Sequence, residues 1–373
     1  MAIPGLSFPF PTQTDNSSDL EDIVLTGFDL KRFVVPDFHR YGKCRPVTDF
    51  HKICKFGEGT FGTVYKVKDK RTDEVVALKK LKIHKESECM PLNFTREIII
   101  LKELKHKNIV NLHGVAVGKS IESTYLILEY CSFVLSNVID EVDTASLLEP
   151  QIKCIMSQLF KGLDYIHKHF VIHRDLNPTN ILFTQGGILK ISDFGCSCKA
   201  SSGDLSPHVV SRWYRPPEIL FGSTKYTYTV DIWSSGCVFS ELLLRNALFR
   251  GDSDTDVIRK IVDCLGTPTE DTWPGFTELP LLKDYDIYLQ PVNRLRSFFE
   301  KQTIICHSLL ERIFFYNPET RYSAEQCMNH EYFLEKPLAC APDLLLPILI
   351  DDLSSFKHYK PIDGLSYTAE AYM

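Results

Sequence analysis

A polar stretch followed by a triplet that begins with Asp constrains this 373-residue chain more than any other feature. The stretch is His173–Asn180 (HRDLNPTN), and past two apolar runs it is followed by Asp193–Gly195 (DFG). A carboxylate such as Asp175 can accept a proton from a hydroxyl, whereas Asn180 and Asp193 offer hard oxygen ligands suited to Mg²⁺. Each segment alone also fits an ordinary polar loop between strands, but together they indicate a catalytic site.

A glycine-rich segment precedes this site in the chain. Its residues are Phe56, Gly57, Glu58, Gly59, Thr60, Phe61, Gly62, Thr63 and Val64. Glycines let backbone N–H groups approach phosphates closely, where a side chain would clash. A glycine-rich hairpin turn is the alternative interpretation. A dinucleotide-binding fold is disfavoured, because it needs a helix directly after the loop and a strand over Val64–Val67 is predicted instead.

A lysine in an apolar strand and a glutamate beside an apolar helix face form a candidate pair. Lys79 lies in a strand predicted over Glu74–Leu81, and its apolar neighbours mean that its ammonium requires an anionic partner. A lone strand lysine is more often solvated. Glu97 lies in a helix predicted over Pro91–Lys105, next to the apolar stripe, where a carboxylate is either paired or costly.

The secondary-structure patterns divide the chain into a β-rich part and a helical part. A second strand is predicted over Ser123–Tyr130, and the helical period dominates after residue 131. The expected fold class is α+β, with a small β-rich lobe and a large helical lobe over residues 47–333. Residues 1–46 are expected to be a loosely ordered extension, and residues 334–373 a tail packed on the domain. One predicted helix has the apolar face Ile152, Ile155, Leu159, Leu163 and Ile166.

Composition and charge exclude several classes of protein. The 42 Lys and Arg against 48 Asp and Glu give a formal charge of −6, which leaves no basic excess for nonspecific binding to nucleic acid or anionic membranes. The longest apolar stretches are far shorter than the ~20 residues that span a bilayer. Residues 1–11 lack the pattern of a secretion signal, so the 12 Cys are expected to be reduced thiols in an intracellular protein.

The order of these motifs resembles that of eukaryotic protein kinases. Pro216–Glu218 (PPE) stands where those enzymes carry Ala-Pro-Glu. Within the family, Asn93–Glu97 (NFTRE) and Val209–Glu218 (VVSRWYRPPE) resemble the cyclin-dependent branch. Tyr41–Arg45 and Glu335–Leu338 are similar to segments in the subgroup of cyclin-dependent kinases 10 and 11. The resemblance covers roughly residues 41–345.

The resemblance implies a bilobal protein kinase fold and a cyclin-dependent, proline-directed Ser/Thr kinase that uses ATP and Mg²⁺. Asp175 would accept the proton of the substrate hydroxyl, and Asn180 and Asp193 would hold Mg²⁺. Lys79, positioned by Glu97, would hold the ATP phosphates beneath the glycine-rich segment.

The resemblance also implies a hinge and partners. Glu129 to Cys131 would hydrogen-bond adenine. A cyclin and protein substrates with Ser/Thr-Pro sites are the implied partners, in cell-cycle or transcription control in the nucleus or cytoplasm. Glu218 and Arg321 are expected to form a buried structural ion pair, and Asp231 to accept backbone hydrogen bonds near the catalytic loop.

Two positions are implied to be regulatory. Ser206 stands at the family's activating phosphorylation site, where a phosphate would contact Arg96 and Arg174. An ordinary Ser–Pro turn is the alternative interpretation. Phe61 occupies the position of an inhibitory tyrosine, so only Thr60 could carry such control in the glycine-rich segment.

Three residues depart from the family pattern. Asn177 replaces a Lys that contacts the γ-phosphate, Val134 replaces an Asp that contacts the ATP ribose, and Cys198 replaces an Arg of the phosphate clamp. Losing one transition-state cation costs a few kcal/mol. The alternative function is therefore a kinase-fold scaffold that binds a cyclin without efficient phosphoryl transfer.

Overall fold

The computed structural model divides the chain into two compact parts, Met1–Arg45 and Pro46–Met373. It describes residues 24–26, 32–34, 44–59, 62–81, 92–118, 123–141, 147–200 and 203–345. In the first part, β1 (Val24–Thr26) pairs with the antiparallel strand β2 (Arg32–Val34). This short hairpin was not predicted from the sequence, and the rest of residues 1–43 lies outside the described residues.

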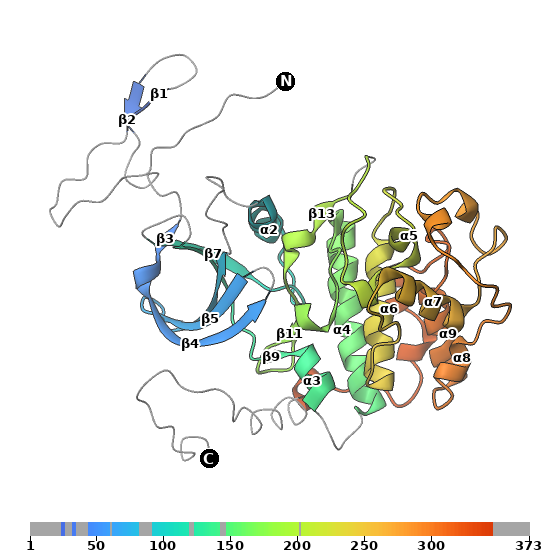
Figure 1. Cartoon of the computed structure of the whole chain (residues 1–373). Helices are drawn as coiled ribbons and strands as arrows, with labels where there is room; N and C mark the ends of the chain where they lie inside the picture. Colours follow the sequence, from blue (N-terminus) through green and yellow to red (C-terminus); the bar gives the residue numbers. More distant parts are fainter. Residues whose placement is uncertain are drawn as a thin grey trace. The chain divides into compact units, whose positions relative to one another are not determined.

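The second part begins with a curled sheet with the strand order β3-β7-β8-β6-β5-β4 (Figure 1). The strands predicted over Glu74–Leu81 and Ser123–Tyr130 are confirmed as β6 and β8. Strands β4 to β8 pair antiparallel with their neighbours. The six strands are β3 (Arg45–Pro46), β4 (Phe50–Gly59), β5 (Gly62–Asp69), β6 (Val75–Leu81), β7 (Leu112–Val117) and β8 (Thr124–Glu129).

Alternation along β6 assigns its side chains to two faces. Val76 and Leu78 pack in a small core on one face, whereas Ala77 belongs to the main core on the other. Because successive side chains of a strand point to opposite faces, Lys79 emerges on the same face as Ala77. The strand therefore places the Lys79 side chain on the face that carries the main core.

Helix α2 (Leu92–Glu103) packs in the same main core. It confirms the helix predicted over Pro91–Lys105, of which Pro91 lies outside the described residues. Phe94 and Leu101 are buried, and Glu97, which lies between them in the chain, is only 3% exposed. The three- and four-residue spacing thus carries the carboxylate inward with the apolar stripe.

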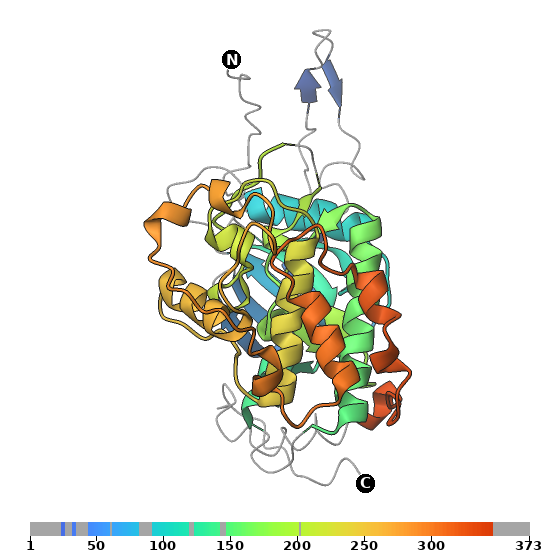
Figure 2. The same ribbon diagram turned by 90° about the vertical axis from the view of Figure 1, so that its right-hand side faces the viewer.

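The helical region is built around α4 (Glu149–Lys168) and α6 (Thr229–Leu244), which pack against each other (Figure 2). The apolar face predicted for α4 is confirmed, because all five of its residues are buried. Helix α6 is buried nearly all round, since 13 of its 16 residues are buried, as expected of a helix enclosed by others. The remaining described α-helices are α3 (Leu135–Glu141), α5 (Pro217–Leu220), α7 (Asp254–Leu265), α8 (Leu295–Phe298), α9 (Ile304–Ile313) and α10 (Ala324–Met328).

Short strands position the two polar motifs. Strands β9 (Phe133–Val134), β11 (Ile181–Phe183) and β12 (Leu189–Ile191) form one sheet, and β10 (Val171–Ile172) pairs with β13 (Cys198–Lys199). The polar stretch His173–Asn180 therefore connects β10 to β11, and the triplet Asp193–Gly195 follows β12. Because β11 and β12 are antiparallel neighbours, the end of the first motif and the start of the second meet at one edge.

The described part of the C-terminal region packs on α4. The Nζ atom of the fully buried Lys153 donates to the backbone oxygens of Glu335 (2.8 Å) and Pro337 (2.9 Å). The chain then enters a short 3₁₀ helix, Pro342–Leu345, whose last side chain is buried. Residues 346–373 of the predicted tail lie outside the described residues. Within the described segments, no helix combines the length and apolarity needed to cross a bilayer.

Candidate active site

The side chain of Lys79 joins the sheet, helix α2 and the segment after β12. Its Nζ atom lies 2.9 Å from both Oε1 and Oε2 of Glu97, and 3.0 Å from Oδ1 of Asp193. The contact predicted between Lys79 and Glu97 is therefore present. The structure adds Asp193, which lies 114 residues further along the chain than Lys79.

The charges around Lys79 keep its ammonium protonated. Burial alone would lower the pKa of Lys79, but the adjacent carboxylates of Glu97 and Asp193 outweigh burial and raise this pKa above its ordinary value. One cation faces two carboxylates here. The cluster can therefore bind an anionic group through Lys79 and a cation through Asp193.

Asp175 and Asn180 are joined across the polar stretch. The Nδ2 atom of Asn180 donates to the backbone oxygen (2.8 Å) and to Oδ2 (3.1 Å) of Asp175. The N–H and hydroxyl of Ser192 both donate to the backbone oxygen of Asn180, at 2.9 and 3.0 Å. Because Asp193 follows Ser192 directly, these bonds bring the two predicted Mg²⁺ ligands to one place beside the predicted proton acceptor.

Asp231 on α6 anchors the start of the polar stretch His173–Asn180, which is called the catalytic loop below. Its carboxylate accepts hydrogen bonds from the backbone N–H groups of His173 (2.8 Å) and Arg174 (2.9 Å), which confirms the predicted backbone acceptor. Its Oδ2 also lies 2.9 Å from Nε2 of His167. Burial alone would raise the pKa of Asp231, but the hydrogen bonds and charge of these partners lower it below its ordinary value.

Asn177 is the centre of a hydrogen-bond network formed by Asp175, Thr179 and Ser211. Its Nδ2 atom lies 3.2 Å from Oδ1 of Asp175 and 3.3 Å from Oγ of Ser211, and its Oδ1 accepts from the N–H of Thr179 at 2.9 Å. The Ser211 hydroxyl donates to Oδ1 of Asp175 at 2.7 Å. The amide thus orients the carboxylate, but it brings no positive charge to the loop.

The glycine-rich segment is a hairpin between β4 and β5. Gly57 faces Val64 and Glu58 faces Thr63 in the strand register, whereas Thr60 and Phe61 lie outside the described residues. Gly62 has a φ of 156°, and a Cβ atom there would lie 2.1 Å from the backbone oxygen of Lys80. A side chain at this position would therefore clash with β6.

The predicted hinge follows β8. The Glu129 N–H donates to the backbone oxygen of Asn111 at 2.9 Å, and the ring of Tyr130 meets that of Phe56 edge-on with centroids 5.6 Å apart. Burial raises the pKa of the Cys131 thiol to about 12, so the thiol is neutral. Val134 pairs with Leu182 of β11 and supplies no polar group of its own.

Ser206 is exposed and reaches Arg174 indirectly. Its backbone oxygen accepts from the Tyr226 hydroxyl at 2.6 Å, and Arg174 donates to that hydroxyl at 3.1 Å. Among the described residues, no hydrogen bond joins the Ser206 hydroxyl to Arg96 or Arg174. Burial raises the pKa of the Cys198 thiol, which therefore contributes no charge.

Sequence analysis missed the special backbone at Val210. Its φ is 68°, in the left-handed region, which is rare for a β-branched residue. The Val210 carbonyl oxygen accepts from Nε (3.1 Å) and Nη2 (2.9 Å) of Arg215, and Arg215 is in turn held by Asp254 at 2.9 Å. No local pattern reveals this conformation, although both residues lie within the segment Val209–Glu218.

The predicted ion pair between Glu218 and Arg321 is confirmed. Two bonds of 2.7 and 3.0 Å join the side chains, and both residues are buried. The cysteines of the described segments form no disulfide bond with one another.

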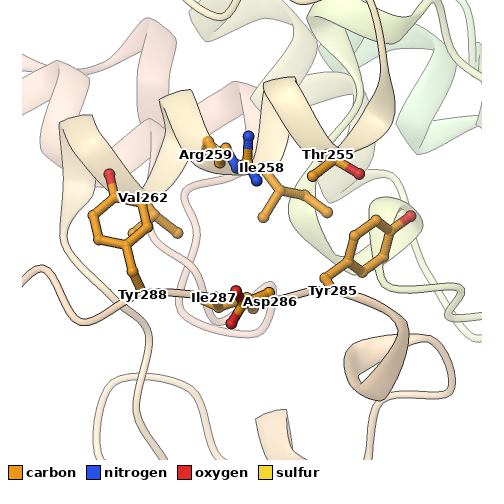
Figure 3. Close-up of a pocket in the computed structure, with 8 residues that line it drawn as sticks. All are labelled: Thr255, Ile258, Arg259, Val262, Tyr285, Asp286, Ile287 and Tyr288. Carbon is orange, nitrogen blue, oxygen red and sulfur yellow. The ribbon is translucent and has the colours of Figure 1, made fainter.

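A narrow hollow lies away from these residues on the helical region. It is bounded by α7 and residues 285–288, and Figure 3 shows Thr255, Ile258 and Val262 directed from the helix toward that segment. The space is too tight to hold a water molecule. It contains none of the predicted site residues.

Comparisons with known proteins agree with this geometry. Residues 50–333 match the protein kinase domain family. Cyclin-dependent kinase 10 of Homo sapiens is 42% identical over 315 residues, which are 84% of this chain and 87% of that protein. Cyclin-dependent kinase 11 of Dictyostelium discoideum is 42% identical over 82% of this chain and 86% of its own length. A chain in the structure of the CAK complex from Chaetomium thermophilum bound to ATP-γ-S is similar with a TM-score of 0.73 and 32% identity, covering 79% of this chain and 94% of that one.

Proposed function

The chain belongs to the cyclin-dependent branch of the protein kinases, and on this premise we propose that it phosphorylates Ser or Thr residues that precede Pro. As a Ser/Thr protein kinase of this type, it uses ATP and Mg²⁺. The observation that carries the catalytic assignment is the joint contact of Lys79 with Glu97 and Asp193, because it assembles three distant segments around one cation.

The nucleotide would bind between the hairpin and the loops after β10 and β12. Lys79 would hold the α- and β-phosphates, and Glu97 would fix the orientation of its ammonium. The segment Phe56–Val64 would cover the phosphates with backbone N–H groups, and the backbone of Glu129 and Cys131 would bind adenine.

Mg²⁺ would bind to oxygen atoms of Asn180 and Asp193. Protein Mg²⁺ sites commonly use one or two such ligands together with substrate phosphates and water. Asn180 and Asp193 fit this arrangement, because both offer hard oxygen donors and the bonds from Ser192 to the Asn180 backbone oxygen hold the two residues close together. Bound Mg²⁺ supplies neutralisation of phosphate charge.

Asp175 would orient the substrate hydroxyl and accept its proton. Bonds from Asn177, Asn180 and Ser211 fix the two carboxylate oxygens before substrate arrives. Such positioning carries most of the rate enhancement in phosphoryl transfer, because the transferring group needs little covalent help.

The backbone at Val210 supports the preference for proline. Its carbonyl is turned toward the Arg215 guanidinium, so it cannot accept a hydrogen bond from a peptide at the same time. A substrate residue with an N–H there would lose a partner on binding, whereas proline has no N–H to satisfy.

The partner would be a cyclin bound against α2. Ile99 on this helix is 52% exposed and Phe170 is 70% exposed, so both apolar side chains are accessible to a partner. Lys199 connects the two regions through Glu103 Oε2 (2.5 Å) and the backbone oxygen of His169 (3.4 Å). A partner bound against α2 would hold Glu97 against Lys79. The complex would form in the nucleus or cytoplasm.

Ser206 and Thr60 are the proposed regulatory sites. A phosphate on Ser206 would be drawn to Arg174, which already contacts the same segment through Tyr226. Clamping would be weaker than with three arginines, because Cys198 is neutral. Thr60 would carry inhibitory phosphorylation in the glycine-rich segment.

The catalytic loop favours one alternative function. Asn177 supplies no cation for the γ-phosphate, so the chain could act as a cyclin-binding scaffold with little phosphoryl transfer. Lys79, Glu97, Asp175, Asn180 and Asp193 are all retained, and this supports the kinase over the scaffold.

ATP turnover with the co-purified cyclin tests the proposal. We expect phosphorylation of a Ser–Pro peptide and much slower phosphorylation of the matched Ser–Ala peptide. Asp193→Asn should abolish both reactions, which excludes a contaminating kinase. Equal rates on the two peptides would reject proline direction. No turnover in the parent chain, with turnover restored in Asn177→Lys, would establish the scaffold instead.

A further inference from the structure

A basic groove lies behind the hinge, on the side of the loop that follows α2. It has a volume of about 530 Å³ and is lined by residues 104–107, 109–111 and 113 together with Glu129 and Lys190. Lys105 and Lys107 are exposed at this loop, and His113 is exposed on the strand after it. None of these three exposed residues has a role in the proposed phosphoryl transfer.

The charges that line the groove do not cancel. Lys190 is paired with Glu129 at 2.8 Å, which is the groove's acidic residue. Lys105 donates to the neutral side chain of Asn111 at 2.7 Å, so its charge is not compensated by this contact. Nearby Asp164 is already paired with Lys168 at 3.0 Å. The lysines of the groove therefore exceed its carboxylate by two, on a chain whose formal charge is −6.

The loop holds its cations on a fixed backbone. The Lys105 N–H donates to the Tyr165 hydroxyl at 2.9 Å, and the Asn108 side chain donates to the backbone oxygen of Leu189 at 3.0 Å. Val110 donates to the backbone oxygen of Ile191 at 3.0 Å. Because these bonds tie the loop to α4 and β12, a ligand would not have to order it, and the entropic cost of binding is reduced.

We propose that this groove binds an acidic peptide segment of a protein partner. Charge complementarity between the excess lysines of the groove and the carboxylates of the peptide supplies the attraction. Nucleic acid fits less well, because the His106 ring is already stacked on Tyr165, with centroids 4.7 Å apart, and is not available to stack on a base. Docking here would tether a substrate or regulator beside the hinge without occupying the catalytic loop.

Fluorescence anisotropy with a labelled peptide of Asp, Glu and Gly tests this proposal. The peptide lacks Ser and Thr, so it cannot be phosphorylated, and binding is measured on the full chain with its cyclin. We expect saturable binding that weakens as salt is raised from about 0.05 M to about 0.5 M. The double variant Lys105→Glu/Lys107→Glu should weaken binding at least about tenfold.

A matched pair of exposed lysines provides the control. Lys283→Glu/Lys301→Glu makes the same charge change on the helical region, and it should alter binding less than about twofold. Thermal unfolding and Ser–Pro peptide turnover confirm that both variants are folded. Equal weakening by the two pairs, or no saturable binding, would overturn the proposal. Tighter binding of a single-stranded oligonucleotide than of the peptide would also overturn it and assign the groove to nucleic acid.

Discussion

Two buried ion pairs in the second part of the chain differ in how completely their charges are balanced. Arg321 bonds Glu218 at 2.7 and 3.0 Å and donates further to the backbone oxygens of Phe315, Thr229 and Tyr316. Lys79 bonds Glu97 in a similar way but also approaches Asp193. The first pair has one cation and one anion, and the second has one cation for two anions.

This difference separates a structural pair from a functional one. The donors of Arg321 all end on protein acceptors, so the pair cannot take a ligand without losing bonds it already makes. The second carboxylate beside Lys79 is unfavourable until another cation arrives. We infer that the excess negative charge of this cluster lowers the stability of the fold, and that binding of Mg²⁺ and phosphate balances the charges. Such unbalanced groups are common at functional sites.

Breaking the structural pair should have the largest effect. Glu218→Ala leaves the Arg321 guanidinium buried and unpaired, and we expect the free energy of unfolding to fall by about 3–5 kcal/mol. Urea unfolding measures this. Glu97→Ala, the matched change in the other pair, should cost less because Asp193 still neutralises Lys79. Equal losses in the two variants would contradict the distinction.

Breaking the functional pair should act on catalysis. Lys79→Met removes the cation that we propose binds phosphate, and we expect kcat/KM to fall by about 10²–10³-fold, equivalent to about 3–4 kcal/mol. Turnover of a Ser–Pro peptide by the cyclin-bound enzyme measures it. Lys80→Met, one residue further along the same strand, is the control and should retain near-normal turnover.

Asp231 is a further buried carboxylate that, like Glu218, is expected to act on stability. Its pKa is lower in the folded chain than in the unfolded chain, so its contribution to stability is present above about pH 4 and is lost as the pH falls through the folded pKa. Asp231→Asn should cost about 2 kcal/mol at neutral pH. The gap between the two proteins in urea unfolding should shrink below about pH 4, and a gap that stays constant would refute this account.

Adding a positive charge at position 177 should raise the rate of phosphoryl transfer. Asn177→Lys restores a cation near Asp175, and we expect kcat to rise about tenfold, or about 1.4 kcal/mol. Asn177→Leu, which lacks both the charge and the hydrogen bonds, should lower kcat. A Lys variant no faster than the parent would show that other groups already neutralise the γ-phosphate.

Completing the phosphate clamp should have the smallest effect. Cys198→Arg places a third cation near Arg96 and Arg174, and we expect phosphorylation of Ser206 to stimulate turnover about threefold more than in the parent. The ratio of phosphorylated to unphosphorylated activity measures this gain. Cys198→Ser should leave the ratio unchanged, and a gain in that variant would point to the loss of the thiol instead.

The two ion pairs also show which contacts can be predicted from local sequence patterns and which cannot. Glu97 was assigned to Lys79 because an apolar strand and an apolar helix face each carried one charge that needed a partner. Glu218 and Arg321 were paired only through the family resemblance, because no local pattern relates residues 103 positions apart. Residues 60 and 61 of the glycine-rich segment lie outside the described residues, so predictions that involve them remain predictions.

The sequence by itself determined the order of the motifs, the fold class and the charged residues of the site, because local periodicity and residue chemistry act over a few positions. Only the tertiary structure decided that Asp193 completes the Lys79 cluster and that Asn177 and Ser211 orient Asp175. It also decided the left-handed backbone of Val210 and the basic groove behind the hinge. These features depend on side chains brought together by packing and on a strained backbone whose partner Arg215 is itself held by the distant Asp254, and neither leaves a short-range pattern in the sequence.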